Sequence, residues 1–478
     1  MTHGRNEACL SHAWLIAVMA VAACGSIGTS ADSGSGPGPG SDPGGSPRFI
    51  EEKAGKSITC EKRVAARISF WSSRAYEDSK EETMRAVSIL RRWLSPTLNF
   101  VHAARLVSLW TAVAGLVESR KASITAIGRA SGRRAYPKHR IKAVDRLVGN
   151  PRLHAELSGI YAASARLLLG SVKRVIVVVD WTQVSTTLWA LRAAATASGR
   201  ALPLYAEVHP VAKLGNRRVH RRFLAQVRAL VPPDCHVVVL TDAGFGCPWF
   251  EMVAALGWDY VGRIRGLKQV RYVGSDHWLP SASIRAQATT TPRSLGQHEV
   301  GKWQPWRTWL VSVSKRLKGR KRLGRRGQPR TNGADRKHAR GAREPWLLAT
   351  SLNTLRPRQI VALYAKRMQI EELFRDEKNT RFGWSFGAIT VASNDPSRAA
   401  ALIAIVALGV VAMTLLGLTI EARDLHGRFQ ANTIRRRRVL SLFVLGTLAA
   451  ASGECLPTPT ELLQALATLR SNAWNFPS

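Results

Sequence analysis

Unbroken apolar runs lead into an aspartate at two places in the chain. Val175–Val179 is followed by Asp180, and Val237–Thr241 is followed by Asp242. Both runs are short and rich in β-branched residues, which is typical of strands buried on both faces of a sheet. Ligands bind at the carboxyl ends of strands in α/β sheets, so both aspartates are expected at a ligand-binding edge. One such aspartate is more often a turn or a helix cap, but two favour a site.

The segment Tyr364–Lys378 has helical periodicity instead. At about 100° per residue, four of its polar residues share a stripe roughly 60° wide beside an apolar stripe: Tyr364, Arg367, Glu371 and Lys378. This pattern predicts one continuous helix that packs on a core through its apolar face. A carboxylate can hold a divalent metal, and Arg, Lys and Tyr can bind phosphates, so the segment favours phosphoryl transfer on a polyanion. An amphipathic surface helix with ion pairs is the alternative.

The two aspartates and the helical glutamate can act as one site. Three carboxylates that a fold brings together can hold two magnesium ions. One ion then activates a water or a 3′-hydroxyl, and the other stabilises the leaving oxygen, so no covalent nucleophile is needed. The candidate ligands are Asp180, Asp242 and Glu371.

These motifs resemble the DDE transposases of bacterial insertion sequences. Asp180-Trp181-Thr182, Thr241–Phe245 and Tyr364–Lys378 carry the likeness, and the last matches the Y-x2-R-x3-E-x6-K signature of the IS-four family at every position. The resemblance covers roughly residues 84–450. It implies an α/β fold with an RNase H-like core, in which the three acids bind Mg²⁺ and Mn²⁺ substitutes for it.

The resemblance also implies residues that bind DNA. Tyr364, Arg367 and Lys378 would hold backbone phosphates near the transposon end. Trp346 is similar in context to a tryptophan that stacks on a flipped base in relatives that cut through a DNA hairpin, with a core tryptophan as the alternative. Arg263 falls where the family has a basic residue near the active site, with a solvent-facing strand arginine as the alternative.

Patterning and resemblance together predict six segments. The RNase H-like core is interrupted by a mostly β insertion domain and preceded by a helical DNA-binding domain. The segments are 1–83, a lipoprotein-like signal and Gly/Ser/Pro linker; 84–165, the helical DNA-binding domain; 166–265, the first part of the core; 266–350, the insertion domain with a basic loop; 351–425, the second part of the core with the signature helix; and 426–478, a C-terminal helical segment.

The net charge of the chain limits the classes of partner that it is expected to bind. Seventy Lys and Arg against 32 acids give a formal net charge of +38, which indicates nucleic acid or an anionic membrane surface rather than an acidic small molecule. The uncharged run Ala399–Ile420 is long enough to span a bilayer, but the family has a buried core helix here, so no stable membrane partner is expected. The expected partner is double-stranded DNA, both terminal inverted repeats and target, bound by a homodimer that cuts in trans.

The first residues follow a different pattern. Arg5 precedes the apolar run Ala13–Ala23, and Cys24 follows as in a bacterial lipoprotein signal peptide. Residues 25–47 have the composition of a flexible tether. We interpret this front as a fusion to a transposase that begins near Met84, with a misplaced start codon as the alternative. A cytoplasmic, nucleoid-associated enzyme is expected, because export would separate it from DNA.

The predicted activity is cut-and-paste transposition, with metal-dependent hydrolysis at the insertion-sequence ends followed by strand transfer into target DNA. Two alternatives stay open. One is an inactive DNA-binding relic fused to a lipoprotein N-terminus, which would bind DNA equally well in EDTA and never cut it. The other is a nuclease of the same fold, which would cut DNA but not join it.

Overall fold

The computed structural model describes residues 85–132, 135–197, 199–314, 344–387, 394–431, 433–434, 436–453 and 456–472. The chain divides into two units, Met1–Ile68 and Ser69–Ser478, and all described residues belong to the second. The predicted signal peptide and linker, and the whole of the predicted basic loop (315–343), lie outside the described residues.

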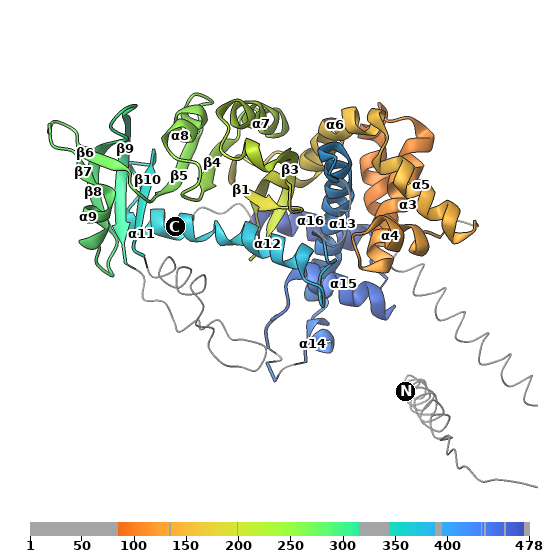
Figure 1. Ribbon diagram of the computed structural model, residues 1–478. Helices are drawn as coiled ribbons and strands as arrows, with labels where there is room; N and C mark the ends of the chain where they lie inside the picture. The colour runs from red at the N-terminus through yellow and green to blue at the C-terminus, as the bar shows by residue number, and fades with distance from the viewer. Residues whose placement is uncertain are drawn as a thin grey trace, which may run out of the picture. The chain divides into compact units, whose positions relative to one another are not determined.

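One ten-stranded sheet organises the described residues, in the order β3-β2-β1-β4-β5-β10-β9-β8-β6-β7 (Figure 1). The strands are β1 (Arg174–Gln183), β2 (Leu188–Thr196), β3 (Ala201–Pro210), β4 (His236–Thr241), β5 (Asp259–Ile264), β6 (Gln269–Tyr272), β7 (Leu279–Pro280), β8 (Arg293–Val300), β9 (Trp306–Val313) and β10 (Trp346–Thr350).

Five strands form the half of the sheet that carries the two aspartates. β1 pairs with β4 and β4 with β5 in parallel, whereas β2 and β3 are antiparallel neighbours on the other side of β1. The apolar runs of β1 and β4 are buried, as a central parallel pair requires. This mixed α/β arrangement is consistent with the predicted RNase H-like core.

The strands after β5 extend the same sheet. β10 pairs antiparallel with β5, and β9, β8, β6 and β7 follow outward. The described residues 266–314 and 344–350 therefore have the predicted β character, with one short helix among these strands, α9 (Ser281–Ala286). The limits of a separate insertion domain stay a prediction.

The prediction of one continuous signature helix is wrong at Lys366–Arg367. The structure has α11 (Pro357–Ala365) and α12 (Met368–Lys378), which follow one another along the sheet (Figure 1). Between them, the Lys366 and Arg367 amides donate to the carbonyls three residues earlier, at 2.9 and 3.0 Å. Such bonds belong to a tighter turn than the α-helix. Tyr364 therefore lies on α11 and Glu371 on α12.

The long apolar run forms α13 (Pro396–Ala422), which is long and apolar enough to cross a membrane by length and composition. Its most apolar window is 94% buried within the fold. The helix packs against α15 (Leu442–Ser452), β3, α3 (Ala103–Ser119), α6 (Pro151–Leu169) and α16 (Pro459–Asn472). Burial on so many sides is what the predicted core helix requires.

The helices before β1 form an N-terminal layer, in agreement with the helical pattern. Ser123 caps α4 (Ile124–Ala130), because its Oγ accepts a hydrogen bond from the Ala126 amide at 3.2 Å. Residues 85–94 are also helical. The remaining elements are η1 (Ser95–Leu98), α4 (Ile124–Ala130), α5 (Pro137–Val148), η2 (Val211–Lys213), α7 (Arg217–Leu230), α8 (Cys247–Ala254) and α14 (His426–Phe429).

Candidate catalytic site

The two aspartates lie on neighbouring strands. Asp242 is the first residue after β4, as predicted, whereas Asp180 lies within β1 because that strand continues to Gln183. Val179 and Thr241 are cross-strand partners, so the aspartate that follows each lies at the same level of the sheet. Asp180 Oδ1 accepts a hydrogen bond from the Trp181 amide, and Asp242 Oδ1 accepts one from the Gly244 amide, both at 2.8 Å.

Arg367 joins the first aspartate to the helical glutamate. Its Nη1 lies 3.4 Å from Asp180 Oδ2, and its Nη2 donates to Glu371 Oε1. The Arg367 side chain is only 13% exposed, so it makes these contacts largely away from water. The structure therefore brings Asp180, Arg367 and Glu371 together, although they come from β1, the α11–α12 turn and α12.

The acids of this site repel one another. Burial raises the pKa of Asp180 to about 7, the charges of Asp242 and Glu371 act in the same direction, and Arg367 opposes them. Asp242 and Glu371 are therefore both within electrostatic range of Asp180. A cation placed among them would be stabilised by that negative field.

The three carboxylates are suitable ligands for a divalent metal, but their side chains do not lie close enough together to hold one. Among the described residues, no group of three His, Cys, Asp or Glu side chains lies close enough to hold an ion. The guanidinium of Arg367 instead bridges Asp180 and Glu371. Three carboxylates on two strands and a helix are the oxygen ligands that Mg²⁺ prefers, so the residues fit the predicted metal once Arg367 shares or leaves this position.

Tyr364 and Trp346 flank the site from α11 and β10. Tyr364 is buried, and its ring meets that of Trp346 edge-on, with 4.9 Å between centroids. Burial raises the pKa of the Tyr364 hydroxyl to about 12, against the opposing charges of Arg367 and Arg263. Trp346 is only partly buried, so part of its ring stays accessible. Its role in stacking on a base stays a prediction.

Arg263 is mostly shielded from solvent, unlike the alternative of a solvent-facing strand arginine, and its role near the active site stays a prediction. Its side chain is 14% exposed, and Nη2 donates to the Glu344 carbonyl at 3.1 Å. Burial lowers its pKa, while the nearby Tyr364 and Glu344 oppose that effect. Its Nε is buried and has no partner in the described part of the chain.

Lys378 ends α12 and binds the strand that carries Asp180. Its Nζ donates to Thr182 Oγ1 at 2.7 Å and to the Gln183 carbonyl at 2.8 Å. A hollow of about 710 Å³ opens beside it, and none of the described residues that line it is acidic. The cations along its wall are Arg120, Lys121, Lys378 and Arg381.

The sequence patterns did not identify the ion pair between Arg192 and Glu377, which holds α12 against the sheet. A signal for it was present. Glu377 stands four residues after Leu373 and three after Phe374, so it occupies the apolar stripe of the helix. Arg192 likewise interrupts an apolar strand. A charge at a position where burial is predicted indicates a buried partner of opposite sign.

A buried histidine beside β1 makes the stability of the fold depend on pH. His220 of α7 accepts a hydrogen bond at Nε2 from Trp181 Nε1 at 3.2 Å, which requires an unprotonated Nε2. Burial, and then the charge of His209, lowers the pKa of His220 from 6.5 to about 4. The unfolded chain therefore binds a proton at a higher pH than the folded chain does.

The unfolding free energy is expected to fall by about 2 kcal/mol between pH 7 and pH 5 through this group alone. Chemical denaturation at the two pH values measures it. The difference between them should shrink in His220→Gln and stay unchanged in the control His277→Gln, which alters an exposed histidine. Equal pH dependence in all three proteins would contradict the assignment.

Comparison with known proteins covers the strands and the helix that carry the three acids. No curated protein matches the chain. Residues 172–408 match the family described as the transposase DDE domain, and this range contains β1, β4 and α12 with their three acids. This match supports a transposase function for the chain, that is, a DNA-processing enzyme of DNA transposition and recombination.

Proposed function

We propose that the chain is a cut-and-paste transposase of the IS-four family. It hydrolyses DNA at the ends of an insertion sequence and transfers the freed 3′-hydroxyls into target DNA. The observation that carries this proposal is the grouping of Asp180, Arg367 and Glu371, with Asp242 at the same level of the neighbouring strand. The match to the transposase DDE domain supports it.

In this function Asp180, Asp242 and Glu371 hold Mg²⁺, or Mn²⁺ in its place. A bound divalent cation supplies Lewis-acid activation of the attacking water or 3′-hydroxyl and stabilises the leaving oxygen. The three carboxylates outnumber the single guanidinium of Arg367, so the site carries excess negative charge that divalent cations neutralise. Burial of Asp180 and Arg367 limits the screening of these charges by water.

The cations around the acids bind the DNA. Arg263 and Tyr364 lie on one side of the acids, and Lys378 lies at the far end of α12. Each can bind a backbone phosphate, and the basic hollow beside Lys378 continues the positive surface toward α3. These contacts hold the scissile phosphate without reading its sequence. Trp346 stacks on an unpaired base, and its partly buried position beside the Tyr364 ring supports this role.

The assembly and location follow from the same function. Cutting two ends in trans needs a homodimer on double-stranded DNA that carries the terminal inverted repeats, and a third DNA segment serves as target. We place the active protein in the cytoplasm with the nucleoid. N-terminal sequencing of the expressed protein tests the proposed start near Met84, because a mature end at Cys24 would contradict it.

The decisive experiment compares metals on DNA that carries the element's own ends. The full chain should bind these ends in EDTA, nick them at the 3′ ends only with Mg²⁺ or Mn²⁺, and join them to a target plasmid. Binding without cutting in every metal would identify the DNA-binding relic instead. Cutting without joining would identify a nuclease of the same fold.

A further inference from the structure

A fully buried ion pair joins α12 to the sheet. The side chains of Arg192 on β2 and Glu377 on α12 are 2% and 1% exposed. Arg192 Nη2 donates to Glu377 Oε1 at 2.9 Å, and Nη1 donates to Oε2, so the pair is bidentate. The Arg192 guanidinium also lies over the Phe374 ring, 5.3 Å from its centroid.

The pair links the elements that carry two of the three acids. Arg192 is the direct cross-strand partner of Asp180, and directly opposed residues of an antiparallel pair point to the same face of the sheet. Glu377 lies six residues after Glu371 on one helix, or about 9 Å along its axis. Any rotation or sliding of α12 that moves Glu371 away from Asp180 must therefore also break this pair.

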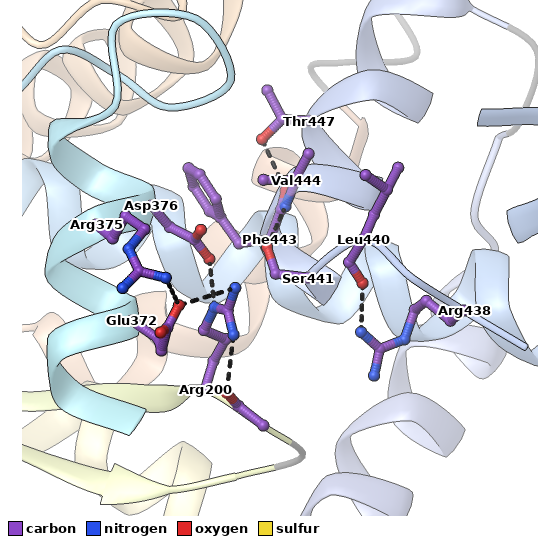
Figure 2. A network of polar contacts seen from close by, with 11 residues as sticks. Arg200, Glu372, Arg375, Asp376, Arg438, Leu440, Ser441, Phe443, Val444 and Thr447 are labelled. Atoms are coloured by element: carbon purple, nitrogen blue, oxygen red, sulfur yellow. Dashed lines mark hydrogen bonds and ion pairs between the residues drawn. The ribbon is translucent and has the colours of Figure 1, made fainter. Parts of the chain in front are cut away.

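A second arginine binds the same helix beside the first. Figure 2 shows the guanidinium of Arg200, from the turn between β2 and β3, between Glu372 and Asp376. Its Nε lies 2.9 Å from Asp376 Oδ2, and its Nη2 lies 3.5 Å from Glu372 Oε2. Arg200 is more exposed than Arg192, so it contributes less. Both arginines bind acids other than Glu371.

Attachment alone does not explain a buried ion pair at this position. Dehydrating two charges offsets most of their attraction, and apolar residues of similar volume usually stabilise a core as well or better. Ile370, Leu373 and Phe374 already bury the same face of α12. A bidentate pair adds a defined geometry, because a planar guanidinium meets a carboxylate in one orientation, whereas apolar side chains can slide.

We propose that the Arg192–Glu377 pair positions the catalytic site by fixing the rotation and register of α12, so that Glu371 faces Asp180 and Asp242. Neither residue touches the metal or the DNA. This inference rests on the proposed function, in which Glu371 binds the metal. It predicts that the pair can be replaced without loss of folding but not without loss of metal affinity.

The test replaces both charges by apolar side chains of similar size. In the full chain, Arg192→Met/Glu377→Leu is expected to keep a melting temperature near that of the unchanged protein. Its affinity for Mn²⁺, measured by electron paramagnetic resonance, should fall about tenfold, and its cleavage rate about 100-fold, as expected for a ligand displaced by about 1 Å. Raising the Mn²⁺ concentration should recover part of the rate.

Two further variants control for folding. Arg423→Met/Glu461→Leu removes another bidentate ion pair, 30% and 28% exposed, between the end of α13 and α16, and should change neither affinity nor rate. Arg192→Lys keeps the positive charge but cannot form the bidentate pair with Glu377. It should lose Mn²⁺ affinity even if the apolar double variant does not fold.

The outcomes separate the two proposals. Unchanged Mn²⁺ affinity and rate in a folded Arg192→Met/Glu377→Leu protein, or in Arg192→Lys, would overturn the positioning role alone. An unchanged protein that neither binds Mn²⁺ nor cuts its ends would refute the proposed function and, with it, this inference.

Discussion

Glu371→Gln is expected to lower the rate of end cleavage by about 10³-fold at saturating Mg²⁺ while end binding stays within about twofold. The amide keeps the size of the side chain but removes one of three charges that hold the metal, at a cost of about 4 kcal/mol in the transition state. The half-exposed Glu371 tolerates the amide without unfolding. Gel assays of nicking and of band shift on the same DNA measure both quantities.

The neighbouring residue supplies a matched control. Glu372 is also acidic and also on α12, but it binds Arg200 and Arg375 on another side of the helix. Glu372→Gln should therefore leave the cleavage rate within about threefold, because it breaks only partly exposed ion pairs. If the two variants lose activity equally, the catalytic acid is not Glu371.

Much of this site could be predicted because its parts follow local patterns. Buried strands read as unbroken β-branched runs, so the chain itself indicates where β1 and β4 lie and that an aspartate belongs to each. The pairing of β1 with β4 is different. It brings together residues that are far apart in the chain, with β2, β3 and α7 between them, and it was expected only from the resemblance.

Other features depend on tertiary contacts, which the periodicity of the sequence does not predict. The turn at Lys366–Arg367 is such a case. The polar and apolar stripes predict an uninterrupted helix there, whereas in the structure the amides bond to carbonyls three residues earlier. In the predicted stripe Arg367 was only a phosphate ligand. In the structure its guanidinium instead binds Asp180 and Glu371, an arrangement that needs the position of β1 relative to α12. The Arg192–Glu377 pair likewise depends on which strand lies beneath the helix.

The bridging position of Arg367 predicts the second large effect. Arg367→Gln is expected to lower the unfolding free energy by about 3 kcal/mol in EDTA, because it leaves the buried Asp180 beside two other acids without the nearest cation. Mg²⁺ should then restore more stability in the variant than it adds to the unchanged protein, since the metal no longer competes with a guanidinium. Thermal unfolding in EDTA and across Mg²⁺ concentrations measures both.

This prediction separates Arg367 as a charge among the acids from Arg367 as a phosphate ligand alone. A residue that only grips DNA would change neither stability in EDTA nor the response to Mg²⁺, yet would still weaken DNA binding. Arg375→Gln, which alters a more exposed arginine on α12 bound to Glu372, is the matched control and should change none of these quantities strongly. If Mg²⁺ stabilises Arg367→Gln no more than the unchanged protein, the guanidinium and the metal do not share Asp180 and Glu371, and the proposed metal site must lie elsewhere.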